Sequence, residues 1–352
     1  MYFGNSVLLK TFSCDNISLC NSIEKEGSML TQGKLLRNVL IMNMGRQLED
    51  ISESMYGKGV SSLEAEQIYI VVICMVKGLL DTFVRNLGEK KFYYISTAFE
   101  KGSFLENNLT NLGIYEMLEG VLKEKGQKMS TLKKVEEEYI GKANSFEQTS
   151  ERFFEESQKS GLPSEAMGIR YIREFEDKDK VVNNYDSEKS WLEKQDFSYE
   201  ITFNNIKAKI LFYNMDVVGK DKEIYKFHLY DLEIQDEIPN QEKQIYYDYF
   251  LVSSSVRQIL QEMRNNKYDL RKMNDYVKIG TEGKYISFVI PELIRIMVDE
   301  KAIPVGEAIE VVRKTCGYSD LDMMIEAVKQ CPLEYVEKLV PHLVEKIENI
   351  KK

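Results

Sequence analysis

Carboxylates recur at short spacing in the last quarter of the chain, where they could do acid–base chemistry. Asp320 lies two residues before Asp322, and Glu292 is followed by Asp299 and Glu300. Two carboxylates that flank a substrate can act as general acid and general base. On the helices of an acidic protein, however, such groups are more often solvated or cap a helix end, and we favour that interpretation.

Nucleophiles and metal ligands have weaker support. The three serines at 253–255 are not surrounded by a Gly-x-Ser-x-Gly motif. His228 lies in an alternating, strand-like stretch and His342 lies among leucines at helical spacing, so we expect both to pack rather than react. The five cysteines form no Cys-x-x-Cys pair, and two histidines supply a zinc site poorly. We therefore expect no catalytic site and no metal site.

The composition is that of an ordinary globular protein with an acidic surface. Of the 352 residues, 43% are hydrophobic and 30% are charged, which is typical of chains that fold. A net charge of -10 leaves no broad basic surface, so neither nucleic acid nor an anionic membrane is an expected partner. The longest apolar run, residues 68–76, is far shorter than the roughly 20 residues of a membrane span. The first residues lack the features of a secretory signal, so we expect a cytoplasmic protein with reduced thiols.

The first third of the chain predicts helices around one strand. Residues 1–60 are mixed and polar, with a helical stretch at 33–51, and are interpreted as an N-terminal extension or arm. Ser61 and Glu64 have the spacing of a capping box, which predicts a helix from residue 61 to about 86. The β-branched and aromatic residues 90–99 predict a strand, and a charged helical region follows at 114–160.

The remainder predicts further strands that alternate with helices. Residues 199–203 and 206–213 alternate around an Asn-Asn pair, which indicates a hairpin, and residues 224–234 form another predicted strand. We also expect a strand at 249–254 before a helix, and a strand at 275–281 before a helix that opens at Pro291. Strands alternating with helices predict an α/β fold with a parallel sheet and helices on its faces.

Nine segments of this chain together resemble, in order, the N-terminal half of the α-1,4-glucan phosphorylases (glycogen, starch and maltodextrin phosphorylase). KFYYISTAFEKGSFLENNLTNLGIYE (91–116) and GLPSEAMGIRY (161–171) are two of them. The others are residues 189–203, 213–219, 227–233, 248–260, 289–300, 317–332 and 337–350. The resemblance covers roughly residues 61–352.

This resemblance implies a fold and a domain organisation. The fold would be a Rossmann-like glycosyltransferase lobe of the GT-B type with an inserted antiparallel β region, formed by residues 61–352 and preceded by the arm at 1–60. In the family, the lysine that holds pyridoxal phosphate belongs to a second domain, which would begin about where this chain stops. We therefore expect the second domain and the cofactor to be absent.

The resemblance also implies that the family's site residues in this first domain have been replaced. The glycine-rich loop of the family is similar to residues 137–149, which place Lys142, Asn144 and Ser145 in its path, and a Cβ there obstructs the close approach of an anion. Ala98 stands where the family has a glutamate. The family's NDTHP matches Glu282, Gly283, Lys284, Tyr285 and Ile286, and Leu321 stands at the histidine of its YTNHT. The segment between Ile238 and Ile245, which carries a dimer-contact helix in the family, is cut to a few residues.

Three functions remain open at this point. The leading hypothesis is a non-catalytic, phosphorylase-like protein that binds a protein partner, such as a complete phosphorylase or another enzyme of glucan metabolism. The second is half of a split phosphorylase, active only with a separate second-domain chain. The third is a glucan-binding module with aromatic platforms such as Tyr246, Tyr247 and Tyr249, although we expect weak or no glucan binding. The replaced cleft positions are mostly charged, and we expect them to be exposed: Glu138, Lys142, Glu147, Gln148, Glu282, Lys284, Asp320 and Asp322.

Overall fold

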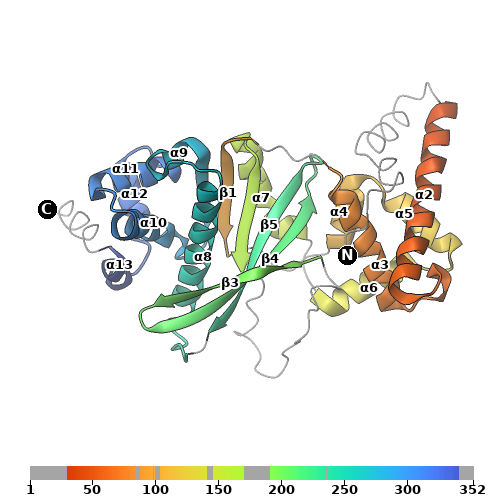
Figure 1. The fold of residues 1–352 in the computed structure, drawn as a ribbon, viewed down its shortest axis with the longest axis horizontal. Coiled ribbons are helices and arrows are strands. Elements are labelled where there is room, and N and C mark those ends of the chain that lie inside the picture. The colour runs from red at the N-terminus through yellow and green to blue at the C-terminus, as the bar shows by residue number, and fades with distance from the viewer. Residues whose placement is uncertain are drawn as a thin grey trace.

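The computed structural model describes residues 30–83, 88–97, 99, 104–140, 146–169, 191–234 and 236–340. Its centre is a six-stranded sheet in the order β3-β4-β5-β2-β1-β6 (Figure 1). Four neighbouring strands are parallel: β5 (Ile224–Ile234), β2 (Ser164–Ile169), β1 (Lys91–Ser96) and β6 (Val277–Glu282). At the β5 side, β4 (Ile206–Val218) and β3 (Glu193–Phe203) continue the sheet in antiparallel pairing. The α/β class is confirmed.

The antiparallel end of the sheet begins with the predicted hairpin. Phe203 pairs with Ile206, and the two residues between them, Asn204 and Asn205, have φ angles of 46° and 69°. Asparagine tolerates positive φ better than most residues, and two such residues make the tight turn whose twist matches the flanking strands. The hairpin prediction at 199–213 is confirmed.

Helices cover both faces of the sheet. One face packs against α8 (Lys243–Asn265), beyond which lie α9 (Met273–Tyr276), α10 (Val289–Arg295), α11 (Val305–Thr315), α12 (Leu321–Val328) and α13 (Leu333–Leu339). The other face packs against α4 (Phe104–Leu112) and α7 (Phe146–Ser160), with α2 (Leu30–Tyr56), α3 (Ala65–Leu80), α5 (Tyr115–Glu124) and α6 (Met129–Ile140) beyond them (Figure 1). Among these helices, none is long and apolar enough to cross a membrane.

The sheet separates two hydrophobic cores. Tyr93 and Ile95 of β1 belong to the core under α8, whereas Phe92 and Tyr94 belong to the core under α7. Successive side chains of a strand point to opposite faces, so one short strand serves both cores. Because both faces are covered, the central strands are almost continuously buried.

Several predicted elements need correction. Residues 249–254 are not a strand: they lie inside α8, where every residue from Ile245 to Val256 is buried. A short apolar run in a fully buried helix cannot be told from a buried strand by its pattern alone. The helix predicted from residue 61 begins at Ala65, because the capping box is formed by Glu64 and Gln67. Pro291 is the third residue of α10 rather than its opening.

The segment interpreted as an N-terminal arm contains a packed helix. Leu40, Met44 and Leu48 of α2 are buried in the core that also contains residues of α3 and α5. They recur at intervals of four residues, which places them on one face of the helix. Residues 30–56 therefore contribute to the second core, and a domain boundary at residue 60 stays a prediction.

Candidate functional site

The carboxyl ends of parallel strands are where open α/β sheets bind ligands. In this chain β1 and β6 end side by side, with Ser96 in register with Glu282. One carboxylate oxygen of Glu282 accepts hydrogen bonds from the Tyr94 hydroxyl (3.1 Å) and the Ser96 hydroxyl (3.1 Å). The other lies 3.2 Å from the guanidinium of Arg152 on α7. We call Tyr94, Ser96, Arg152 and Glu282 the carboxyl-edge cluster.

Each oxygen of Glu282 is thus engaged by groups of the protein itself. Burial and the neighbouring Glu282 carboxylate raise the pKa of the Tyr94 phenol, so this hydroxyl stays protonated and keeps donating. Aromatic rings occupy the space beside the end of β2: a Cβ on Gly168 would lie 2.7 Å from the Phe99 ring. Phe99 in turn packs edge-on against Phe227, with ring centroids 5.2 Å apart.

The loop that follows β6 contacts Thr97 and is hydrogen-bonded to α8. Gly283 has a φ of +138°, and a Cβ on it would lie 2.5 Å from the Thr97 hydroxyl oxygen. The backbone N–H of Tyr285 donates to the carboxylate of Asp248 on α8 (3.0 Å), which also accepts from Gln244 (2.6 Å). Burial raises the pKa of Asp248 to about 6. The backbone of Tyr285 therefore anchors the loop to α8.

The structure brings together only part of the predicted set of site residues. Glu282, Gly283, Lys284 and Tyr285 form the end of β6 and its loop, whereas Leu321 opens α12. Lys284, Asp320 and Asp322 are exposed as expected, but the Glu282 side chain is only 21% exposed and is engaged as described above. Ala98, Lys142, Asn144 and Ser145, together with the side chains of Glu138, Glu147 and Gln148, lie outside the described residues.

The carboxylates that the sequence suggested for acid–base chemistry are either exposed caps or buried structural groups. Asp320 caps α12 by accepting the N–H of Met323 (2.8 Å), as expected for a solvated capping group. Glu292 is fully buried, which contradicts the solvated interpretation. Its carboxylate accepts hydrogen bonds from Tyr249 and Ser253 and pairs with Arg295, so it is a structural group.

The prediction that Tyr246, Tyr247 and Tyr249 form aromatic platforms for glucan binding is wrong. Tyr246, Tyr247 and Tyr249 are 3%, 7% and 3% exposed and belong to the core under α8. Tyr249 stacks on Phe203 of β3 with ring centroids 3.7 Å apart. A sugar ring has no access to these faces.

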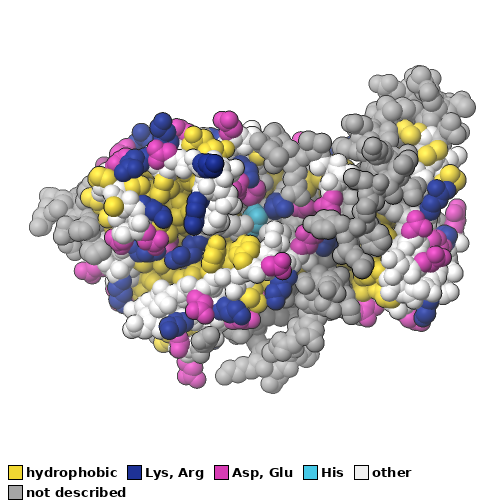
Figure 2. All heavy atoms as spheres, viewed as in Figure 1, with side chains coloured by type: hydrophobic (Ala, Val, Ile, Leu, Met, Phe, Trp, Pro, Cys, Tyr) yellow, Lys and Arg dark blue, Asp and Glu magenta, His cyan; other side chains and the backbone are white. Residues whose placement is uncertain are grey.

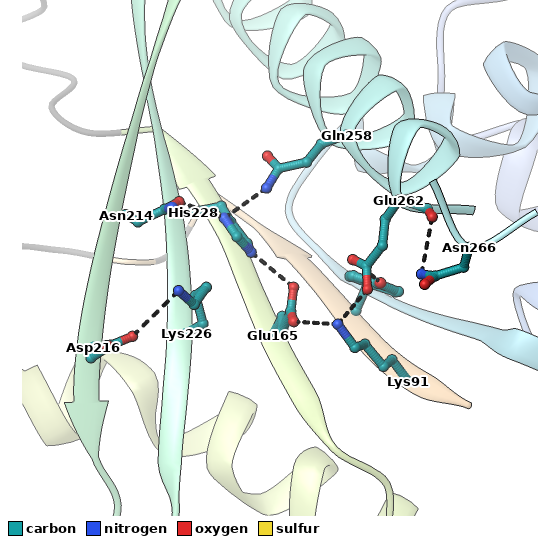
Figure 3. Close-up of polar contacts among 10 residues, drawn as sticks. Lys91, Glu165, Asn214, Asp216, Lys226, His228, Gln258, Glu262 and Asn266 are labelled. Carbon is teal, nitrogen blue, oxygen red and sulfur yellow. Dashed lines mark hydrogen bonds and ion pairs between the residues drawn. The ribbon is translucent and has the colours of Figure 1, made fainter. Parts of the chain in front are cut away.

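A second set of polar residues, which the sequence did not predict, lies on the sheet face under α8 (Figure 3). We call it the buried polar row; it comprises Lys91, Glu165, His228, Asn214, Gln258 and Glu262. His228 Nε2 lies 2.8 Å from one oxygen of Glu165, and Lys91 Nζ lies 2.9 Å from the other. Lys91 also pairs with Glu262, which accepts the Tyr93 hydroxyl (2.7 Å).

Neighbouring charges decide the ionisation of this row. Burial alone would raise the pKa of Glu165, but hydrogen bonds and charge from His228 and Lys91 outweigh burial and lower it to about 2. His228 is 5% exposed, and both of its ring nitrogens contact protein groups, so the ring offers no open position to a substrate. Across the described residues, no group of three or more His, Cys, Asp or Glu side chains is placed to hold a metal ion.

A groove of about 310 Å³ is lined by the C-terminal half of α8, by β3 and by residues between 268 and 301, and we call it the basic groove. Its lining includes Tyr199, Tyr268, Arg257, Arg264 and Lys301, and Glu300 is the one acidic residue among the lining residues. Within the described part of the chain, these three cations have no ion pair, and Arg257 Nε is buried without a hydrogen-bond partner. Figure 2 shows basic side chains gathered over the helices α8 to α11. In a chain with a net charge of -10, such a local excess of unpaired positive charge is a candidate binding surface.

Comparison with known proteins agrees with this α/β architecture. Residues 234–352 match the family model of carbohydrate phosphorylase. The resemblance to the glucan phosphorylases is confirmed, and its extent is consistent with the N-terminal half of that family.

Individual relatives show how far the similarity reaches. Maltodextrin phosphorylase of Streptococcus pneumoniae is 26% identical over 339 residues, an alignment that covers 86% of this chain and 45% of the relative. Glycogen phosphorylase of Bacillus subtilis is 23% identical over 323 residues (76% and 40%), and the human brain form of glycogen phosphorylase is 24% identical over 323 residues (73% and 38%). The chain spans less than half the length of these relatives.

Proposed function

We propose that this chain is a non-catalytic, phosphorylase-like protein that binds or regulates a protein partner in glucan metabolism. The observation that carries the proposal is that the Glu282 carboxylate in the carboxyl-edge cluster is already hydrogen-bonded and paired within the protein. Glu282 accepts from Tyr94 and Ser96 and pairs with Arg152, so its oxygens are committed to the fold. Tyr285 and Leu321, which stand at histidine positions of the family, cannot transfer protons as an imidazole does.

The proposal extends to fold and cofactor. The sheet would be the first lobe of a GT-B glycosyltransferase, with β3 and β4 as its inserted antiparallel region. In sequence, Lys142, Asn144 and Ser145 stand in place of the family's glycine-rich loop, and we propose that the chain works without pyridoxal phosphate. A cytoplasmic location is part of the same proposal, and the free thiols of Cys74, Cys316 and Cys331 support it.

The direct test is an activity measurement. Purified chain is incubated with maltodextrin and phosphate, with and without pyridoxal phosphate, and glucose 1-phosphate is measured beside a maltodextrin phosphorylase as positive control. We expect no product and no saturable cofactor absorbance. Saturable absorbance together with product release that disappears on cofactor removal would overturn the proposal.

The partner half of the proposal is supported by the basic groove. Arg257, Arg264 and Lys301 have no ion pair among the described residues, so they suit a partner that presents carboxylates. Tyr199 and Tyr268 add the aromatic contacts typical of interface centres. A complete phosphorylase is the first candidate to test. Calorimetry should show binding that the double change Arg257→Glu and Arg264→Glu weakens at least tenfold.

A matched control separates a specific groove from overall charge. Lys284→Glu changes an exposed cation on the loop after β6 and should leave the affinity within about twofold. Equal losses in both variants would show that only net charge matters. An absence of binding at protein concentrations up to the millimolar range would reject a phosphorylase as the partner.

A second candidate function is half of a split phosphorylase. It is favoured by one observation, the coverage of less than half of each relative. Mixing the chain with a separately expressed second domain of a maltodextrin phosphorylase should give no product under our proposal. Phosphorolysis that needs both chains would select the split enzyme instead.

A further inference from the structure

The strand β3 forms one margin of the sheet (Figure 1). It pairs with β4 on one side, and no strand of the described residues pairs with its other side. A margin of this kind presents backbone N–H and C=O groups that can pair with another extended segment. The pairing with β4 is regular from Ser198 to Phe203, whereas a bulge interrupts it between Lys194 and Ser198. The stretch available to a further strand is therefore residues 198–203.

The hairpin turn decides which backbone groups of β3 face outward. Phe203 and Ile206 flank a two-residue turn, so they form a pair that exchanges both backbone hydrogen bonds. Such pairs occur at every second position of an antiparallel ladder. The backbone groups of Ser198, Glu200 and Thr202 therefore point away from β4.

One hydrogen bond of β4 agrees with this alternation. Lys207 lies opposite Thr202, and its N–H donates to the side chain of Asp236 (2.9 Å) instead of to β3. Thr202 and Lys207 thus form a pair whose backbone groups face away from each other. The outward backbone groups of Thr202 belong to the margin of the sheet.

The side chains of the same stretch alternate between the two faces of the sheet. Tyr199, Ile201 and Phe203 pack on the α8 side, whereas Glu200 and Thr202 are exposed on the opposite face. A strand added to the margin follows the same alternation. Every second side chain of the added strand would therefore lie on the α8 side.

The basic groove borders β3 on the α8 side. Tyr199 lines it together with Arg257 and Arg264 of α8 and with Lys301. The two arginines are seven residues apart on one face of the helix, which separates them by about 10.5 Å along its axis. Side chains at alternate positions of a strand are about 6.8 Å apart, so two or three successive ones span the distance between the arginines.

The charge of the groove selects acidic side chains. Arg257, Arg264 and Lys301 have no ion pair among the described residues. The acidic lining residue Glu300 already pairs with Arg295 (3.2 Å). An acidic segment is repelled by a chain with a net charge of -10 as a whole but attracted at this groove. A second copy of the chain fits less well, because antiparallel pairing of two β3 strands would place two basic grooves on the same face of the joined sheet.

We propose that the outer margin of β3 and the basic groove form one docking site for an extended acidic segment of a protein partner. The segment adds to the sheet as a further strand along residues 198–203, and its carboxylates, at alternate positions, pair with Arg257 and Arg264. Main-chain hydrogen bonds supply affinity, and the arginines select acidic residues. The inference rests on the proposed function, since it names the kind of segment by which the protein partner binds.

The test uses a short synthetic peptide in which glutamate and threonine alternate and both ends are capped. Its binding to the full chain is measured by fluorescence anisotropy, and hydrogen exchange followed by mass spectrometry locates the bound peptide. We expect saturable binding that weakens as salt is added, together with slower amide exchange within residues 198–203. Binding without protection of β3, or no binding up to millimolar peptide, would overturn the proposal.

Two methylated forms of the peptide separate strand addition from charge alone. One form carries N-methyl groups on its threonines and the other on its glutamates, so both keep the charge of the parent peptide. Backbone groups of a strand point alternately to its two edges, so only one form loses the N–H groups that face β3. We expect that form to bind at least tenfold more weakly, and the other to stay within about threefold of the parent peptide. Equal affinities would show that backbone pairing does not hold the peptide.

Matched variants of the chain locate the site on β3. Glu200→Pro removes an outward N–H, a change that an edge strand tolerates, and should weaken binding at least tenfold. Glu200→Thr removes the same charge but keeps the N–H, and should bind the peptide at least as tightly as the parent chain. Similar affinities of the two variants would refute the pairing. If circular dichroism shows that Glu200→Pro does not fold, the methylated peptides decide the question on the parent chain.

The outcomes also separate this inference from the proposed function. A phosphorylase that binds while the peptide does not would overturn the inference alone. A peptide that binds and protects β3 while no phosphorylase binds would retain the docking site and reject a phosphorylase as the partner. A dimer in sedimentation that the peptide dissociates would assign the margin of β3 to a second copy of the chain and overturn the proposal.

Discussion

The carboxyl-edge cluster and the buried polar row lie on opposite faces of one sheet and differ in how their charges are handled. Arg152 leaves 67% of its side chain exposed while it pairs with Glu282. In the buried polar row, Lys91 and Glu165 are 18% and 16% exposed, and each has more than one partner. An exposed ion pair contributes little to the free energy of unfolding, because water can replace it. Removal of one member of a buried network leaves the remaining charges without partners, which costs more. Substitutions in the carboxyl-edge cluster, where ligands usually bind, should therefore cost less stability than substitutions in the buried polar row.

The largest effect should come from breaking the buried polar row. Glu165→Ala leaves Lys91 and His228 without their shared carboxylate, and we expect a loss of about 3–5 kcal/mol in the free energy of unfolding. Glu282→Gln keeps an acceptor for Tyr94 and Ser96 and should cost about 1 kcal/mol or less. Urea denaturation of both variants measures the contrast. A larger loss in Glu282→Gln would reverse the comparison between the two clusters.

The next effect concerns pH and the loop after β6. The pKa of Asp248 is raised to about 6, so folding favours its protonated form, and the stability present below its ordinary pKa is lost as the pH rises through about 6. Asp248→Asn keeps the acceptor for Tyr285 without the charge. We expect this variant to gain up to about 3 kcal/mol over the parent chain, with the gain growing between pH 4 and 6 and constant above. Unfolding free energies of the two chains at four pH values test this. A gain that is independent of pH would contradict it.

A smaller effect should follow from a Cβ on the same loop. Gly283→Ala forces a residue with φ near +138° against Thr97, at an expected cost of about 1–3 kcal/mol. Gly120→Ala is the matched control, because Gly120 lies inside α5 with open space around it and should gain about 0.5–1 kcal/mol. Thermal unfolding monitored by circular dichroism compares them. Equal and small changes in both variants would mean that the loop is not fixed by its glycine.

The smallest effect should be that of Arg152→Ala. Its pair with Glu282 is largely exposed, so we expect a loss below about 1 kcal/mol that vanishes at high salt. Urea denaturation at low and high ionic strength measures it. A loss of several kcal/mol would place the carboxyl-edge cluster in the same class as the buried polar row.

The sequence predicted the strands and hairpin with local signals but missed contacts between distant residues. β5 and the hairpin are visible as alternation around Asn204-Asn205, and β1 as a β-branched and aromatic run. β2 was missed because its six residues include Ser164, Glu165 and Gly168, which are poor strand formers. Because β2 was not predicted, no strand pairing could be derived that would place Glu165 beside Lys91 and His228. Its contact with His228 spans 63 residues, and no local spacing reveals such a pair.

The error at 249–254 has a similar origin. The part of α8 from Ile245 to Val256 is buried all round, so it lacks the polar face by which amphipathic helices are recognised. Two of its serines, Ser254 and Ser255, donate to carbonyls four residues back, which satisfies them inside the helix. Burial, rather than local sequence, decided their conformation.

The sharing of β1 between the two hydrophobic cores limits how the chain can come apart. Tyr93 and Ile95 anchor one core, and Phe92 and Tyr94 anchor the other, so neither helical layer can detach without exposing a strand that the second layer also needs. Melting should therefore be a single concerted event rather than two. Insertion of one residue within β1 would send each downstream side chain to the wrong layer, and would harm both halves of the molecule at once.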